Sequence, residues 1–107
     1  MKATDNFHTL GKYRLAPRIL GRGGFGTVYR GLDEQSKPYA IKVFLSDTEE
    51  DHYYNVQELR TEKAAHVALK HKHLVKVHEF QESATLVMSD GTEVSCSYMV
   101  MDLYIAG

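Results

Sequence analysis

Apolar and β-branched residues recur in three short runs in the first half of the chain, at residues 13–20, 27–32 and 39–45. Their composition, bounded by glycine-rich and polar segments, predicts three β-strands. Pro38 precedes the third run, and because proline has no amide hydrogen it belongs at a strand entrance. Residues 1–12 are polar and aperiodic, so we expect them to form a flexible leader.

A segment of different character follows the third run. Residues 53–70 contain no glycine or proline and many good helix formers, which predicts a long helix. Ser46 and Glu49, in the acidic segment before it, have the spacing of a capping box. One stripe of this helix carries residues at spacings of three, four and seven, namely Leu59, Glu62, Ala65, His66 and Leu69.

Two further extended runs, residues 74–80 and 94–101, complete the pattern. Residues 89–92, between them, have the composition of a tight turn. The predicted order is therefore three strands, a helix and two strands, which makes the chain an α+β domain with one long helix between strands 3 and 4.

Glycines cluster between the first two predicted strands, at Gly21, Gly23 and Gly26. Such glycines let backbone amides approach a polyphosphate closely, although the cluster is also compatible with a merely flexible turn. The same spacing occurs in dinucleotide-binding sites, which need a helix directly after the glycines. Here residues 27–29 favour a strand, and no Gly-Lys-Ser/Thr follows as a Walker-type loop requires.

Two charged residues fall on surfaces predicted to be apolar. In an alternating strand Ala40, Lys42 and Phe44 share one face, so the Lys42 ammonium calls for an anion unless it reaches solvent at a strand end. Glu62 lies on the apolar helix stripe, where an ionised carboxylate is costly unless paired. We predict a Lys42–Glu62 ion pair, with Glu58 as the second candidate and a solvated Glu62 as the alternative.

These features in this order resemble the small lobe of the eukaryotic-type protein kinases. The resemblance runs from about Tyr13 to Gly107 and includes Leu-Gly-x-Gly-x-Phe-Gly-x-Val from Leu20 to Val28. It also includes Ala-Ile-Lys at residues 40–42 and, at residues 98–103, a segment similar to the family's fifth strand and hinge. The resemblance implies a five-stranded antiparallel twisted sheet, with residues 13–107 forming the small lobe up to the hinge and the large lobe absent.

The resemblance also implies the roles of individual residues. The glycine loop would fold over the phosphates of ATP, and Lys42, fixed by Glu62, would hold the α- and β-phosphates. Met101 matches the gatekeeper, while the Asp102 carbonyl and the Tyr104 amide would bond the adenine edge. The nucleotide-binding set implied in this way is Leu20, Gly21, Arg22, Gly23, Gly24, Phe25, Gly26, Val28, Ala40, Lys42, Met101, Asp102 and Tyr104.

Phosphoryl transfer needs more than these residues, because aspartates and an asparagine must orient the substrate and hold magnesium. Neither His-Arg-Asp nor Asp-Phe-Gly occurs in the 107 residues. We therefore expect an ATP-binding fragment of a kinase acting on Ser/Thr or Tyr hydroxyls, with Mg²⁺ bound only alongside a complete large lobe. A naturally lobe-only module that docks on a partner protein is the alternative, and a small α+β domain without a nucleotide site is a third possibility.

The composition limits the classes of partner that we expect this chain to bind. Thirteen basic and 14 acidic side chains give a formal charge of −1, which offers no phosphate-neutralising surface for nucleic acid. No apolar stretch approaches the ~20 residues that span a bilayer, so we expect no membrane partner. The single cysteine, Cys96, cannot form an internal disulfide and favours a reducing compartment, hence a cytoplasmic location. Self-association of the isolated lobe is expected, because the surface facing the missing lobe should be apolar.

Several other residues carry weaker signals. The six histidines have no organised cysteine or carboxylate partners, so we expect no metal site. His66 stands where the family usually has a bulky aliphatic residue, four positions after the helix glutamate. Tyr53 and Tyr54 are candidates for phosphorylation, although tyrosines near a helix start more often serve in packing.

Overall fold

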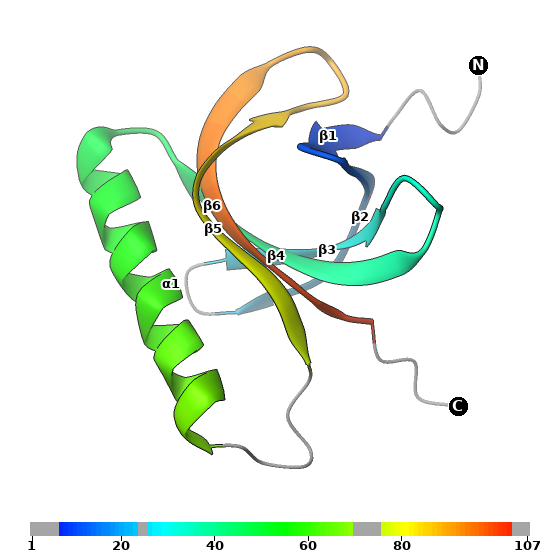
Figure 1. The fold of residues 1–107 in the computed structure, drawn as a ribbon. Helices are drawn as coiled ribbons and strands as arrows, with labels where there is room; N and C mark the ends of the chain where they lie inside the picture. Colours follow the sequence, from blue (N-terminus) through cyan, green and yellow to red (C-terminus); the bar gives the residue numbers. More distant parts are fainter. Residues whose placement is uncertain (1–6, 24–25, 70–75, 104–107) are drawn as a thin grey trace.

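The computed structural model describes residues 7–23, 26–69 and 76–103, except for the side chains of residues 65–69. Within these residues six strands close into an antiparallel barrel in the order β1-β2-β3-β4-β6-β5, and one helix lies against its outside (Figure 1). The elements are β1 (His8–Leu10), β2 (Tyr13–Gly23), β3 (Gly26–Leu32), β4 (Pro38–Ser46), α1 (Glu49–Leu69), β5 (Val77–Val87) and β6 (Glu93–Asp102).

The predicted count of five strands is wrong because of β1. This strand comes from the segment expected to be a flexible leader, and it pairs Thr9 with Arg14 of β2 and with Val87 of β5. It thereby closes the sheet into a barrel, and its Leu10 is fully buried. Three residues are too few for an alternation signal to stand out in a sequence. The helix consequently follows the fourth strand and precedes the fifth.

Helix α1 begins with a different cap from the predicted one. The Asp51 amide donates to Thr48 Oγ1 at 3.0 Å, and the Asp47 amide donates to Asp51 Oδ2 at 3.3 Å. Thr48 is therefore the N-cap residue, while Ser46 still belongs to β4 and accepts a 2.8 Å hydrogen bond from Asn55 Nδ2. The capping box predicted at Ser46 is wrong because the strand runs closer to the helix than the sequence suggests.

The outer face of α1 is exposed and the inner face packs on β4, β5 and β6. Leu59 on the predicted stripe is buried, whereas Tyr53 and Tyr54 are 60% and 62% exposed and so do not serve in packing. Ala65, His66 and Leu69 have side chains outside the described residues. No helix in the described part of the chain has the length and apolar character needed to cross a membrane.

Strands β5 and β6 form a hairpin whose turn confirms the predicted one. The Met88 amide donates to the Thr92 carbonyl at 2.7 Å, and Gly91 takes a φ of 92°, which glycine tolerates without strain. Strand β5 runs on to Val87, well past the predicted run, because residues 81–85 are mostly polar and carry no alternation signal. The predicted residues 74 and 75 lie outside the described part of the chain.

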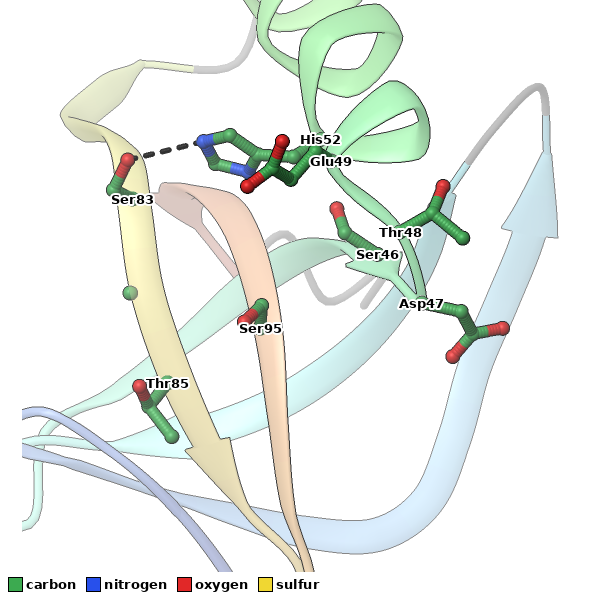
Figure 2. A pocket seen from close by; sticks show the side chains of 9 residues that line it. Ser46, Asp47, Thr48, Glu49, His52, Ser83, Thr85 and Ser95 are labelled. Atoms are coloured by element: carbon green, nitrogen blue, oxygen red, sulfur yellow. Dashed lines mark hydrogen bonds between the residues drawn. The ribbon is translucent and has the colours of Figure 1, made fainter.

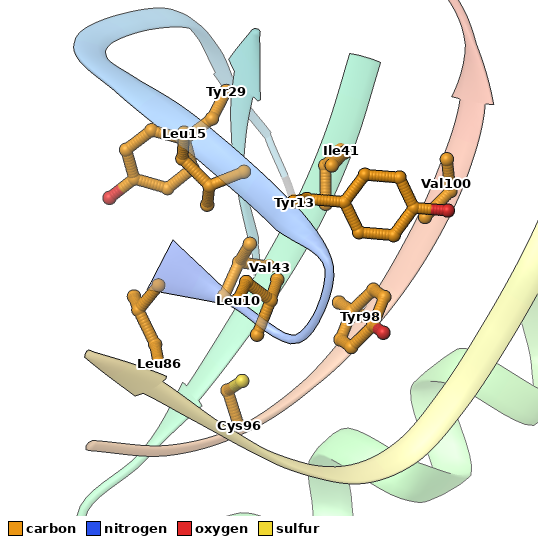
Figure 3. Close-up of a cluster of buried hydrophobic side chains, with 10 residues drawn as sticks. All are labelled: Leu10, Tyr13, Leu15, Tyr29, Ile41, Val43, Leu86, Cys96, Tyr98 and Val100. Carbon is orange, nitrogen blue, oxygen red and sulfur yellow. The ribbon is translucent and has the colours of Figure 1, made fainter. Parts of the chain in front are cut away.

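Alternation along β4 divides the apolar side chains between two clusters. Ile41 and Val43 point into the barrel, whereas Lys42 and Phe44 point toward α1. The cluster inside the barrel, shown in Figure 3, consists of Leu10, Tyr13, Leu15, Tyr29, Ile41, Val43, Leu86, Cys96, Tyr98 and Val100. The cluster beneath α1 consists of Phe44, Leu59 and Met99, with Val77, Phe80 and Met101 packed against it.

A partly buried carboxylate joins three strands of the barrel. Glu79 of β5 accepts hydrogen bonds from the Tyr13 hydroxyl of β2 at 2.9 Å and from the Tyr98 hydroxyl of β6 at 3.2 Å. Gln81 Nε2 donates a third bond at 2.8 Å. Burial, aided by the carboxylate, raises the pKa of both tyrosines, so they stay protonated as donors. This network fixes β2 against the β5–β6 hairpin.

Candidate functional site

The predicted Lys42–Glu62 ion pair is present between the sheet and the helix. Lys42 Nζ lies 2.6 Å from Glu62 Oε1, and the two side chains are only 17% and 22% exposed. The ammonium also lies 5.4 Å from the centroid of the Phe44 ring, beside which it gains a cation–π contact. Glu62, and not the alternative Glu58, thus holds Lys42. The low exposure means that salt screens this pair less than a surface pair.

The ion pair leaves hydrogen-bonding capacity unused. An ammonium has three N–H donors, and Glu62 takes one from Lys42. Glu62 Oε2 is buried and has no hydrogen-bond partner among the described residues. An unpaired buried acceptor is costly, and a partly buried ammonium attracts anions. The arrangement is therefore chemically suited to an anionic group beside Lys42 and a further donor beside Glu62.

Gly26 lies directly against the Lys42 side chain. A Cβ at Gly26 would lie 3.1 Å from both Cγ and Cε of Lys42 and 3.2 Å from Cδ1 of Phe44. These distances are tighter than ordinary van der Waals contacts, so a larger residue would displace the lysine or lift the hairpin. Glycine is thus required at residue 26 for a steric reason, because a larger side chain would clash with Lys42. This requirement is separate from the backbone conformations that glycine allows.

The β2–β3 pairing carries the glycine-rich hairpin to the same place. Gly21 lies opposite Val28, and Gly23 lies opposite Gly26 at the end of the ladder. Val28 is in turn opposite Lys42 on β4, so these two side chains share one face of the sheet. The end of the hairpin therefore lies beside the ion pair. The predicted residues Gly24, Phe25 and Tyr104 lie outside the described part of the chain.

The remaining predicted residues divide into two groups. Ala40 lies opposite Met101, so both share the face of the ion pair, as does the half-buried Val28. Leu20 is 50% exposed and Arg22 is exposed, and no described contact brings either side chain to the ion pair. The structure therefore gathers an apolar floor beside Lys42 and leaves two residues of the predicted set at the surface.

The Asp102 side chain points toward β5. Its Oδ1 lies 2.5 Å from His78 Nε2, and this hydrogen bond holds the pKa of the Asp102 carboxyl below its ordinary value. Any role of Asp102 toward a ligand on the ion-pair face consequently rests on its backbone. Sequence reasoning missed His78, because nothing in the spacing of the chain pairs it with Asp102.

A polar cavity lies elsewhere in the described part of the chain. It has a volume of about 780 Å³ and opens at the N-terminal end of α1, where His52 Nε2 lies 3.1 Å from Ser83 Oγ (Figure 2). Its lining is mostly hydroxyl-bearing and acidic: Ser46, Asp47, Thr48, Glu49, His52, Ser83, Ala84, Thr85 and Ser95. It contains none of the predicted site residues. Among the described residues no three histidine, cysteine or acidic side chains gather as a metal site would require.

Comparison with known proteins decides the family. The family model described as "Protein kinase domain" matches residues 15–105 of this chain. The chain belongs to the protein kinase domain family. That match covers the glycine-rich hairpin, Lys42, Glu62 and the end of β6, which are the residues brought together above.

Individual protein kinases are also similar to this chain in sequence. CBL-interacting serine/threonine-protein kinase 1 of Arabidopsis thaliana is 35% identical over 110 residues, covering 99% of this chain and 21% of that protein. Cold-responsive protein kinase 1 of the same plant is 34% identical over 77 residues, covering 72% of this chain and 17% of that protein. The chain thus spans about a fifth of the length of these curated relatives.

A solved structure has the same fold. The crystal structure of Rad53 1-466 in complex with AMP-PNP matches with a TM-score of 0.53 and 22% identity. The match covers 90% of this chain and 22% of the Rad53 chain. This likeness shows that the barrel and helix share their arrangement with part of the Rad53 chain.

Proposed function

We propose that this chain binds ATP as the small lobe of a protein kinase. The observation that carries the proposal is the Lys42–Glu62 ion pair, positioned beneath the glycine-rich hairpin by Gly26. In this proposal Lys42 uses its free N–H donors on the α- and β-phosphates, while Glu62 fixes its direction. Backbone amides of residues 21–26 cover the phosphates.

The adenine would lie against the apolar part of the same face. Leu20, Val28 and Ala40 would form the apolar roof over the ring, and Met101 would lie at the back of the site. The Asp102 carbonyl and the Tyr104 amide bond the adenine edge, a recognition that needs no particular side chain. Rad53, which shares the fold, was solved in complex with the ATP analogue AMP-PNP, and this supports nucleotide binding by a chain of this fold.

Phosphoryl transfer is proposed only from the membership of the chain in the protein kinase family. We propose that a protein containing this lobe transfers phosphate from ATP to Ser/Thr or Tyr hydroxyls of protein substrates, with Mg²⁺ held by a large lobe. The 107 residues contain neither His-Arg-Asp nor Asp-Phe-Gly, so they bind nucleotide without transferring phosphate. A lobe-only module that docks on a complementing protein is the alternative, and both readings share the nucleotide site.

The proposed location is the cytoplasm. Cys96 is fully buried, and burial raises the pKa of its thiol to about 11. A thiol in this state is a packing group and not a nucleophile. The proposal of a reducing compartment rests on Cys96 being the single cysteine, which cannot form an internal disulfide.

Calorimetric titration with Mg-ATP tests the proposal. Wild type should bind, and Lys42→Met should weaken binding by roughly tenfold or more because the charge-assisted bonds to phosphate are lost. Lys12→Met is the matched control, since Lys12 Nζ also lies 5.4 Å from an aromatic centroid, that of Tyr13, but away from the ion pair. Circular dichroism establishes that each variant is folded. Equal heats from wild type and folded Lys42→Met would exclude the site.

A further inference from the structure

Strand β5 carries an extra residue at His78. Val77 lies opposite Met101 and Glu79 lies opposite Val100, so two consecutive residues of β6 face residues two apart on β5. This is a β-bulge, which breaks the alternation of side chains. Val77 packs beneath α1, yet Glu79 meets the tyrosine hydroxyls of the barrel. His78 is thereby free to point toward the end of β6.

The side chain of His78 joins three strands at that end. Its Nε2 lies 2.5 Å from Asp102 Oδ1, and its ring meets the Tyr39 ring of β4 edge-on, at 5.2 Å between centroids and 74°. Lys37 Nζ lies 5.4 Å from the centroid of the same tyrosine. The Asp102 amide donates to the Lys76 carbonyl at 2.9 Å. The last residue of β6 is therefore held by both its backbone and its side chain.

We propose that His78 is a positioning residue for the nucleotide site: it holds the end of β6 so that the Asp102 carbonyl faces the adenine edge. This inference rests on the proposed function, because it assigns a task to the backbone of Asp102. The bulge supports it, since bulges commonly re-aim a side chain next to a functional site.

The hold on β6 depends on the groups that face His78. Asp102 faces it from β6 and Tyr39 from β4, while Lys37 and Lys76 lie around the same pair and Glu79 is engaged by tyrosines. The hydrogen bond from His78, together with nearby lysines, holds the pKa of Asp102 below its ordinary value of 3.8. The carboxylate is thus charged at neutral pH, and a hydrogen bond to a charged acceptor is stronger than one to a neutral acceptor.

Adenosine is the appropriate probe, because it has the adenine edge but none of the phosphates assigned to Lys42. His78→Gln keeps a hydrogen-bond donor to Asp102, so at one fixed pH its affinity for adenosine should lie close to that of wild type.

His78→Phe keeps a ring against Tyr39 but removes the donor, so its affinity for adenosine should be roughly two- to fivefold lower than that of wild type. His52→Gln, which alters a histidine of the polar cavity, should bind adenosine as wild type does. Wild-type affinity in His78→Phe would overturn the proposal, as would an equal loss in His78→Gln and His78→Phe.

Amide hydrogen exchange separates this proposal from the nucleotide proposal. At one fixed pH and without ligand, the amides of Asp102 and Leu103 should exchange faster in His78→Phe than in wild type. The exchange rate at Leu86 of the barrel should be unchanged. Unchanged exchange at Asp102 and Leu103 would overturn the role of His78 whatever the ligand data show. If neither ATP nor adenosine binds wild type, the proposed function fails and the nucleotide role of His78 fails with it, while faster exchange would still support the hold on β6.

Discussion

At the scale of single residues, Gly31 shows how little space the barrel interior leaves. A Cβ there would lie 2.5 Å from Ile41 Cδ1 and 3.0 Å from Leu15 Cδ2, both fully buried. Gly31→Ala should therefore lower the free energy of unfolding by about 1–3 kcal/mol, the usual cost of overpacking. Urea denaturation measures this loss in the free energy of unfolding. Gly21→Ala is the control, because no described atom lies within 4 Å of its added Cβ; equal losses would contradict the steric account.

The sequence predicts some of these residues well and others not at all. Lys42 and Glu62 could be paired because strand alternation and the helix stripe each place a charge on an apolar face. His78 could not be paired with Asp102, because the bulge breaks the period on which such reasoning depends. Leu20 was expected beside the nucleotide from its motif, and its half-exposed side chain shows that motif and burial are separate properties.

At the scale of elements, the start of α1 depends on Thr48. Its Oγ1 accepts the Asp51 amide, so Thr48→Ala should lower the free energy of unfolding by about 1 kcal/mol. Thr61→Ala on the same helix is the matched comparison. Thr61 Oγ1 only donates to the Gln57 carbonyl, and alanine has the higher helix propensity, so that variant should be neutral or slightly stabilised. Equal midpoints of thermal unfolding for the two variants would refute the assignment of the cap.

The Glu79 network makes the barrel sensitive to acid. Burial alone would raise the pKa of Glu79, but the bonds from Gln81, Tyr13 and Tyr98 outweigh burial and bring it below its ordinary value of 4.5. A carboxyl whose pKa is lower in the folded than in the unfolded protein contributes stability at pH values above its unfolded pKa. That contribution is lost as the pH falls through its folded pKa. Wild type should therefore lose stability below about pH 4.5 more steeply than Glu79→Gln.

Urea midpoints measured across the acid range check this prediction. Glu82→Gln is the control, because Glu82 forms an exposed pair with Arg60 that contributes little to stability. If the urea midpoints of wild type and Glu79→Gln fell in parallel with pH, the tyrosine hydrogen bonds would not stabilise the charged form of Glu79 over its neutral form. That result would contradict the prediction.

Element prediction succeeded where a run was long and regular. The three strands β2 to β4, the helix and the β5–β6 turn were predicted from alternation, helix propensity and turn residues. Strand β1 was missed because only the pairing with β2 and β5, a tertiary effect, makes three residues a strand. The extra strand does not disturb the site, since Lys42 and Glu62 come from β4 and α1 on the outer face.

At the scale of the whole molecule, the ion-pair face has consequences for association. It carries the half-buried Val28, Ala40 and Met101, with Leu20 half exposed at its edge. Apolar surface left uncovered favours self-association, so this chain alone should sediment increasingly as a dimer or larger species as its concentration rises. Leu20→Lys should shift the population toward monomer. A clean wild-type monomer at high concentration would contradict this expectation.

The central claim is that nucleotide binds on the face of the Lys42–Glu62 pair and not in the polar cavity at the start of α1. Nuclear magnetic resonance of the labelled chain during titration with Mg-ATP tests it most directly. The account predicts shifts in the amide signals of Gly21, Gly26 and Lys42 and at Asp102, with those of Ser83 and Ser95 unmoved. Shifts centred on Ser83 and Ser95, or none at any of these amides under saturating nucleotide, would contradict it.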